Sequence, residues 1–338
     1  MIAGQNILIT GVGSIGSRIA EHFLDQDANI VRLFDNNEPR LAEVRSGFGD
    51  DRCRFLIGDI RDADRLNRAM QDIDIVVHTA AMKHVDISEY NAFEAVKTNV
   101  LGLQNLIDAA IENDVQRVVF TSSDKAVEPA NTMGTTKLLG EKLITAANKY
   151  SGRQDLRLTA VRFGNVINSS QSVIPIFHEQ IKTGGPLTLT DPEMTRFFLT
   201  YDDITKLITE ALRRTAGGET FLYKMPAIRI EDLAEAMIEV LAPRYEYDPS
   251  EVAIETIGRR PGETMHEHIM TERETQRAIE SEKLYAIPPE PNGYLDYEGL
   301  DGFEPTGDII RSSENKESLD KDQIVDLITT GAEFGETI

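Results

Sequence analysis

The sequence predicts an α/β protein with a doubly wound, parallel Rossmann sheet and a smaller, mixed C-terminal lobe. Three observations predict this fold. A glycine-rich turn follows the first apolar run, short apolar runs then alternate with helical patterns, and beyond residue 165 prolines interrupt the pattern. We therefore expect one domain over residues 1–165 and a second over residues 166–338, with parts of the two interleaved.

The composition excludes several classes of protein. Asp and Glu number 57 against 35 Lys and Arg, and the net charge is −22, so a basic face for nucleic acid is not expected. The single cysteine, Cys53, excludes a disulfide framework, and the six His residues lack the spacing of metal ligands. No apolar run reaches the length of a membrane span and the start is not signal-like, so we expect a cytoplasmic protein without a membrane span.

The acidic surface has two interpretations. Only 12 of the 35 basic residues are Lys. An acidic, Lys-poor surface suits high salt, where repulsion between carboxylates is screened, but it is equally compatible with an ordinary acidic protein.

The first unit of the chain reads as strand, glycine turn and helix. Residues Asn6–Thr10 form the predicted strand and Ser17–Asp25 the predicted helix. Three glycines between them permit a tight turn and let backbone N–H groups approach a pyrophosphate, whose charge the helix N-terminus favours. The residues expected to bind the phosphates are Gly11, Gly13, Ser14, Ile15 and Gly16.

The second predicted strand, Asn29–Phe34, ends in an acid. Asp35 follows Gly16 by 19 residues, the place where a carboxylate accepts the ribose hydroxyls of a dinucleotide. Because a carboxylate repels a 2′-phosphate, the sequence favours NAD over NADP.

Further α/β steps complete the predicted sheet. Strands are expected at Arg54–Ile57, Ile73–His78 and Gln116–Phe120, with a long helix from about Asn91 to Asn113 before the last of them. We expect the following residues at or near the strand ends to face the cofactor: Asp59, Ile60, Ala80, Ala81 and Lys83. Asn99, on the long helix, is also expected to bind the cofactor.

The predicted chemistry lies after the Gln116–Phe120 strand. The segment Thr121–Lys125 occupies the strand end that faces the nicotinamide in proteins of this class. The following helix, Met133–Tyr150, places Met133 and Lys137 one turn apart on a face directed at that segment. The candidate catalytic residues are Ser123, Asp124, Lys125, Met133 and Lys137.

The rest of the chain is less regular. A sixth strand is expected at Leu156–Phe163, followed by short helices and strands punctuated by prolines. Residues Ala286–Gly307 are rich in Pro, Gly and acid and predict a surface excursion, and Asp320–Thr330 predicts a final helix.

Motifs along most of the chain resemble one known family. They are Gly11–Gly16, Asp59, His78–Val85, Asp124-Lys125, Lys137, Phe163–Val166, Ser172–Pro175, Thr190–Phe197, Arg260–Glu263, and Arg311-Ser312 with Asn315. Over about residues 5–330 the chain resembles the extended short-chain dehydrogenases/reductases and, more narrowly, the UDP-N-acetylglucosamine 4,6-dehydratases of flagellin-sugar and capsule-sugar biosynthesis. Met133 stands where the wider family has a catalytic Tyr, as it does in one branch that includes capsule-type enzymes.

The resemblance implies a reaction and its cofactor. NAD takes hydride from C4 of a UDP-sugar, water leaves across C5 and C6, and the hydride returns to C6. Lys125 is then the candidate base for C5, Asp124 the acid for the C6 oxygen, and Ser123 the partner of the C4 oxygen. Lys137 is expected to hold the nicotinamide ribose. The acceptor of the O4 proton is left open between Asp124 and a bound water.

The resting forms of the central pair are a difficulty for these roles. A free Asp and a free Lys, with pKa values near 3.9 and 10.4, rest as an ion pair. We expect burial and repulsion from Lys137 to lower the pKa of Lys125, so that a proton passes to Asp124 at modest cost.

The resemblance also implies the substrate contacts. For the UDP-sugar these are Asn165, Ser172, Val173, Pro175, Arg196, Arg260 and Glu263, with Lys83 and His84 at the sugar. The arginines and Asn165 would meet the diphosphate, and Glu263 the uridine ribose. For His78 and His84 a structural role is as reasonable as a catalytic one.

Two other functions compete with the dehydratase. A UDP-sugar 4-epimerase shares the fold and cofactor but needs the missing phenol and has no use for Asp124-Lys125. A non-catalytic NAD-binding scaffold would not need the whole set of polar residues. A homo-oligomer, dimer or larger, is also expected.

The charge balance generates a first prediction. If the surface is adapted to salt, the thermal midpoint should rise between low and molar KCl by more than in a near-neutral dehydratase, because salt screens repulsion between carboxylates. Thermal denaturation across a KCl series measures this. An unchanged midpoint would leave only the interpretation of an ordinary acidic protein.

Overall fold

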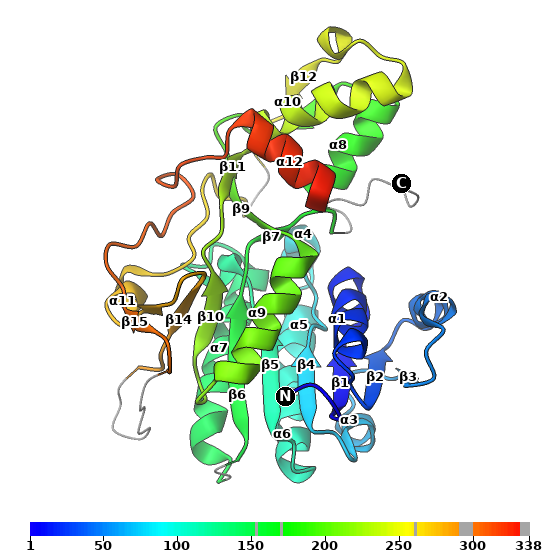
Figure 1. Ribbon diagram of the computed structural model, residues 1–338, viewed down its shortest axis with the longest axis vertical. Coiled ribbons are helices and arrows are strands. Elements are labelled where there is room, and N and C mark those ends of the chain that lie inside the picture. Colours follow the sequence, from blue (N-terminus) through cyan, green and yellow to red (C-terminus); the bar gives the residue numbers. More distant parts are fainter. Residues whose placement is uncertain (153–154, 170–171, 260–261, 291–299, 332–338) are drawn as a thin grey trace.

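A computed structural model describes residues 1–152, 155–169, 172–259, 262–290 and 300–331 of the chain. Within them the main sheet holds ten strands and lies in the larger, lower part of the molecule (Figure 1). Across the sheet the strands run in the order β15 (Glu304–Pro305), β13 (Ile279–Glu280), β14 (Leu284–Ile287), β10 (Thr220–Tyr223), β6 (Arg157–Arg162), β5 (Arg117–Thr121), β4 (Ile75–His78), β1 (Asn6–Thr10), β2 (Ile30–Asp35) and β3 (Cys53–Ile57).

The seven strands from β3 to β10 pair in parallel, and the predicted Rossmann sheet is confirmed. Apolar runs such as Ile7–Ile9 are buried because helices cover both faces of the sheet. One face carries α1 (Ser14–Asp25), α2 (Glu38–Phe48) and α9 (Tyr201–Arg214). The other carries α3 (Ala63–Met70), α6 (Gly102–Glu112) and α7 (Thr132–Tyr150). Cys53 is a buried core residue.

The helix expected over Asn91–Asn113 is present, but it is not regular. It consists of α5 (Ala92–Val96), a π-helical turn η1 (Lys97–Leu101) and α6, and a short helix α4 (Val85–Tyr90) precedes it. A π turn accommodates an extra residue and changes the direction of nearby side chains, which a period of 3.6 does not predict.

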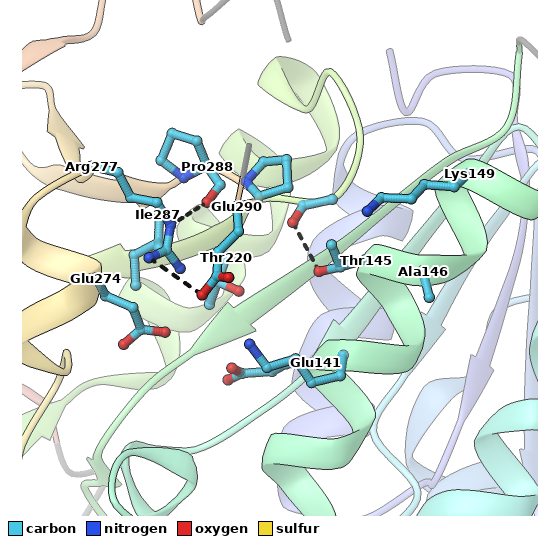
Figure 2. A pocket seen from close by; sticks show the side chains of 13 residues that line it. Glu141, Thr145, Ala146, Lys149, Thr220, Glu274, Arg277, Ile287, Pro288 and Glu290 are labelled. Carbon is cyan, nitrogen blue, oxygen red and sulfur yellow. Dashed lines mark hydrogen bonds and ion pairs between the residues drawn. The ribbon is translucent and has the colours of Figure 1, made fainter. Parts of the chain in front are cut away.

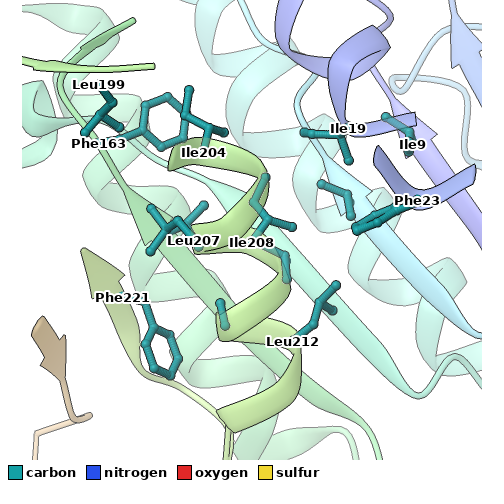
Figure 3. Packing of buried hydrophobic residues seen from close by; sticks show 14 of the residues in the cluster. Ile9, Ile19, Phe23, Phe163, Leu199, Ile204, Leu207, Ile208, Leu212 and Phe221 are labelled. Carbon is teal, nitrogen blue, oxygen red and sulfur yellow. The ribbon is translucent and has the colours of Figure 1, made fainter. Parts of the chain in front are cut away.

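Helix α9 comes from the second half of the chain but packs on the first sheet. Its buried face, which includes Ile204, Leu207 and Ile208, meets the core formed by β1 and α1 (Figure 3). Strand β10 likewise extends the sheet beside β6. The main sheet thus contains strands from both sides of the expected domain boundary at residue 165. The boundary itself stays a prediction.

The second lobe forms the upper part of Figure 1 and has its own apolar core. Its strands are β7 (Asn165–Val166), β8 (Leu187–Leu189), β9 (Thr195–Leu199), β11 (Ala227–Arg229) and β12 (Ile254–Thr256). Its helices are α8 (Val173–Lys182), α10 (Ile230–Leu241), η3 (Ala242–Tyr245), η4 (Pro249–Glu251) and α12 (Lys321–Gly331). No helix in the described ranges is long and apolar enough to cross a membrane.

Two predicted boundaries were wrong. Helix α1 begins at Ser14 rather than Ser17, because the last glycine of the turn lies inside the helix. The segment Ala286–Gly307 is not wholly an excursion, since it begins within β14 and later forms β15 at the sheet edge. Antiparallel pairing with neighbouring strands outweighs the local proline and glycine content there.

The packing of α9 generates a second prediction. Leu207 is fully buried, so Leu207→Ala should lower the free energy of unfolding by roughly 2–5 kcal/mol through lost contacts and a residual cavity. Urea denaturation followed by circular dichroism measures it. The control is Leu139→Ala, at a position 44% exposed on α7, which should stay within about 0.5 kcal/mol of the unchanged protein. Equal stability of the two variants would contradict this packing.

Candidate active site

A cleft of about 610 Å³ opens at the carboxyl ends of the parallel strands. Strand β1 lies between β4 and β2, so the order of the sheet reverses at the β1–β4 pair, the usual place for a ligand in such sheets. The lining includes these predicted residues: Gly11, Gly13, Ser14, Ile15, Gly16, Asp35, Asp59, Ile60, Ala80, Ala81, Lys83 and His84.

The glycine turn is shaped by close backbone approach. Gly11 has φ +85°, and a Cβ there would lie 2.4 Å from the Ala80 nitrogen, whereas a Cβ on Gly16 would lie 2.0 Å from the Gly11 oxygen. Neither position tolerates a side chain. Gly13 has no atom within 4 Å of its would-be Cβ, so the turn is open there, directly before the N-terminus of α1. This open, N–H-bearing turn fits the pyrophosphate of a dinucleotide.

Two acids flank the cleft. Asp35 Oδ2 accepts a hydrogen bond from the Val12 nitrogen at 2.6 Å and Oδ1 accepts from the Asn37 nitrogen at 2.8 Å. Each oxygen keeps a further lone pair for a ribose hydroxyl. Asp59 pairs with Arg61 at 2.6 Å, and hydrogen bonds from Arg61 lower the pKa of Asp59.

Asn99 lies behind the cleft rather than in its lining. Its side chain, on the π turn, accepts from the Met82 nitrogen at 2.8 Å and donates to the Met82 oxygen and to Thr136 Oγ1. Asn99 therefore fixes the segment that follows β4. Its predicted contact with the cofactor stays a prediction.

The predicted catalytic segment forms a one-turn helix, η2 (Asp124–Ala126), directly after β5. Asp124 Oδ1 accepts from Ser123 Oγ at 2.7 Å and from Lys125 Nζ at 3.1 Å. Ser123, Asp124 and Lys125 thus form one hydrogen-bonded group, and the Asp124 side chain is fully buried.

Lys137 extends from α7 toward this strand end, and Met133 lies one turn earlier on the same helix. Lys137 Nζ donates to the Thr121 oxygen at 2.8 Å and lies 4.8 Å from the centre of the Phe120 ring. Burial lowers the pKa of Lys137 to about 8, with the charge of Glu141 opposing the shift. Met133 is buried and offers no group that exchanges protons.

His78 is a structural residue. Its Nδ1 lies 2.6 Å from Thr10 Oγ1, its ring stacks on Phe120, and it is fully buried between strands. Burial, reinforced by the charge of Lys137, lowers its pKa to about 3, so the ring is neutral. His84 differs, since it lies at the start of α4 and lines the cleft.

Sequence reasoning missed one member of the site, Glu267. Its Oε1 lies 2.8 Å from Lys125 Nζ and 3.3 Å from Arg196 Nε, and its Oε2 accepts from Asn165 Nδ2 at 2.9 Å. Lys125 and Glu267 are 142 residues apart. The surrounding segment has no recognised spacing, so only the tertiary fold reveals the contact.

Glu267 also overturns the expectation for the pKa of Lys125. Burial lowers that pKa, but the charges of Asp124 and Glu267 outweigh burial, and the pKa is raised rather than lowered. Burial raises the pKa of Asp124, but the charge of Lys125 and hydrogen bonds from Glu267, Ser123 and Lys125 lower it overall. The pair therefore rests ionised, and Lys137 does not drive a proton from Lys125.

The predicted substrate residues fall into three groups. Asn165 and Arg196 point into the protein, where Asn165 contacts Glu267 and Arg196 donates to the backbone oxygens of Thr264 and Met265. Glu263 lies 3.9 Å from Arg196. Ser172, Val173 and Pro175 are half-buried at the start of α8. Arg260 lies outside the described residues, and the substrate contacts of all of them stay predictions.

A smaller pocket of about 200 Å³ lies elsewhere, beside α7 and β10 (Figure 2). Its lining includes Thr145, Lys149, Arg277 and Glu290, and it holds none of the predicted catalytic residues. The larger cleft reaches Thr121, at the end of the strand that the predicted catalytic segment follows.

The family described as polysaccharide biosynthesis protein matches residues 7–289, which include the cleft and its charged residues. The chain belongs to this family. Its predicted membership of the extended short-chain dehydrogenases/reductases, of the UDP-N-acetylglucosamine 4,6-dehydratase type, is confirmed by this match and by the relatives.

Two relatives of this chain are named for different activities. A UDP-N-acetylglucosamine 4,6-dehydratase (inverting) of Campylobacter jejuni is 40% identical over 292 residues, which are 86% of this chain and 84% of the relative. A UDP-glucose 4-epimerase of Rickettsia prowazekii is 37% identical over 293 residues, which are 85% of this chain and 84% of the relative.

Solved structures share the fold. Pen from Bacillus thuringiensis has a TM-score of 0.89 at 41% identity, and the alignment covers 98% of both chains. DesIV, a dTDP-glucose 4,6-dehydratase from Streptomyces venezuelae with NAD and TYD bound, has a TM-score of 0.65 at 28% identity and covers 77% of this chain and 86% of DesIV.

The acid at the end of β2 generates a third prediction. Because the Asp35 carboxylate lines the cleft and would repel a 2′-phosphate, the purified protein should carry NAD in preference to NADP. Extraction of bound nucleotide followed by mass spectrometry measures it. Asp35→Asn removes the negative charge and should reduce the preference for NAD over NADP. A preparation occupied mainly by NADP would contradict the role of Asp35.

Proposed function

We propose that this protein dehydrates UDP-N-acetylglucosamine, or a close UDP-hexose, to a 4-keto-6-deoxy sugar nucleotide for polysaccharide biosynthesis. The single observation that carries the proposal is the ion pair between buried Asp124 and half-buried Lys125 after β5, beside a dinucleotide-shaped cleft and without a phenol at position 133. A nucleotide-sugar 4,6-dehydratase needs an acid and a base at this place, and the relatives support that class.

NAD is the cofactor, and when bound it supplies a hydride acceptor for C4 and returns the hydride to C6. The chain supplies the site that holds it. Gly11, Gly13 and the N-terminus of α1 would bind the pyrophosphate, and Asp35 the adenosine ribose. Lys137, fixed on Thr121, would donate to the nicotinamide ribose.

Lys125 and Asp124 serve the elimination step of the reaction. Oxidation at C4 acidifies the C5 proton, which Lys125 removes, while Asp124 protonates the leaving C6 oxygen. Ser123 donates its single hydroxyl proton to Asp124 at 2.7 Å, so toward the sugar its oxygen would accept from the C4 hydroxyl. The ionised resting forms of Asp124 and Lys125 are the reverse of those that elimination needs.

The alternatives explain fewer observations. A 4-epimerase has to move only the O4 proton, so it has no use for the second acid–base group of the Asp124–Lys125 pair, which dehydration needs for C5 and the C6 oxygen. A scaffold protein would have no need for the Asp124–Lys125–Glu267 contacts. The cytoplasmic location, the homo-oligomer and a UDP-sugar lobe over residues 166–338 are part of the proposal.

A fourth prediction tests the proposed reaction. With UDP-N-acetylglucosamine the protein should give a product lighter by one water, and label from C4-deuterated substrate should appear at C6. Mass spectrometry and NMR measure both. An isomer of unchanged mass would support the epimerase, and unaltered substrate the scaffold.

Lys125→Ala should separate the two halves of that reaction. We expect dehydration to fall by roughly 10²–10⁴-fold because the C5 base is missing, while enzyme-bound sugar still becomes a 4-ketone that keeps its C6 hydroxyl. The control is Lys142→Ala, an exposed position on α7, which should turn over normally. Full turnover by Lys125→Ala would contradict the assigned role.

A further inference from the structure

Glu267 is buried at the site but has no part in the reaction as proposed above. It is 4% exposed, and its carboxylate accepts from Lys125 and Asn165 and contacts Arg196. The Phe197 nitrogen donates to it at 3.3 Å, and its own backbone nitrogen donates to Ser313 Oγ at 2.9 Å. Four contacts to its side chain and one to its backbone hold Glu267 in one position.

The carboxyl group of Glu267 also touches that of Asp124. Asp124 Oδ2 is buried, and no N–H or O–H donor of the described residues reaches it. Contact between two carboxyl groups is a hydrogen bond only when a proton lies between them. Asp124, Glu267 and Lys125 therefore form a set in which protons have more than one place to reside.

Lys125 has two carboxylates within reach of its proton. The Asp124 oxygen lies 3.1 Å from Nζ and the Glu267 oxygen lies 2.8 Å from it. The distance to Glu267 is that of a charge-assisted hydrogen bond, along which a proton transfers directly, whereas the distance to Asp124 is longer. Asp124 is needed as the acid for the C6 oxygen, so Glu267 is the acceptor that leaves Asp124 free for that role.

We propose that Glu267 is a positioning residue that stores the proton of Lys125 during elimination, an inference that rests on the dehydratase function proposed above. Asp124 then takes the O4 proton as C4 is oxidised. Lys125 passes its own proton to Glu267 and becomes the neutral base that elimination requires.

The protons of this cycle balance. Before elimination Asp124 and Glu267 are neutral acids and Lys125 is a neutral amine. Lys125 takes the C5 proton while Asp124 gives its proton to the C6 oxygen, which leaves as water. Once C6 is reduced, Lys125 returns a proton to C5, and Glu267 returns the stored proton to Lys125. The O4 proton ends in water, and no phenol is required.

The charges around Glu267 suit a group that gains and loses a proton near neutrality. Asp124 and Lys125 face it from η2, Arg196 faces it from β9, and the Asn165 amide faces it from β7. Burial raises the pKa of Glu267 to about 7, and the charge of Asp124 adds to this while Lys125 and Arg196 oppose it. Storage needs the ionised form, so the rate should rise with pH through about 7.

A fifth prediction concerns Glu267→Gln in the full-length protein loaded with its cofactor. We expect kcat for dehydration to fall by roughly 10²-fold near pH 7, with KM little changed, because Lys125 has lost the acceptor of its proton. The rise of kcat through pH 7 should disappear, and activity should recover only in alkali, where Lys125 loses its proton to solvent. Glu267→Asp, which keeps a carboxylate, should restore part of the rise.

The matched control is Glu274→Gln, which removes a partly buried carboxylate that pairs with Arg162 at 3.0 Å rather than with Lys125. It should lower the thermal midpoint but leave the pH profile unchanged. If Glu267→Gln shows the same dependence of kcat on pH as the wild-type protein, the inference is overturned. If that variant does not fold, the pH dependence of the wild-type protein is the test. A wild-type kcat that does not change across pH 7 would also overturn the inference.

Failure of the inference is distinct from failure of the proposed function. An unchanged protein that releases no water from any UDP-hexose refutes the dehydratase itself. One that dehydrates normally, with kcat independent of Glu267 and of pH near 7, refutes proton storage alone.

Discussion

The ionic contact between half-buried Lys125 and buried Glu267 is the interaction on which the candidate site depends. It joins the turn after β5 to a segment that follows the second lobe's sheet, and Arg196 and Asn165 attach that segment to β9 and β7. A buried charge without a partner is costly, so the fold must keep these groups together once water is excluded. The position of the catalytic pair is thus set jointly by both halves of the chain.

Much of the fold could be predicted because its signals are local. Alternating apolar and helical runs located β1 to β6 within a few residues, and the glycine turn and Asp35 located the cofactor cleft. The edge strands β13 to β15 were not predicted, because they are two to four residues long and depend on pairing. The π turn was not predicted either, since it departs from the helical period.

The candidate site divides in the same way. Asp124, Lys125 and Lys137 follow from position after a strand and along a helix, and the structure brings them together. The electrostatics did not follow, because the pKa of Lys125 depends on Glu267, which is distant in sequence. Arg196 and Asn165 were predicted as ligand groups, but the structure uses their donors to fix the protein around Glu267.

The packing of α9 on the main sheet has a consequence while the ribosome makes the chain. Strand β6 ends at Arg162, but the helix that covers this face of the sheet ends at Arg214, about 50 residues later. At roughly 5–20 residues per second, a ribosome needs roughly 3–10 s to make that stretch. For that interval the nascent chain presents the apolar face of a nearly complete parallel sheet, including Ile9 and Val77, to the crowded interior of the cell. This is a surface that chaperones bind and on which neighbouring chains aggregate.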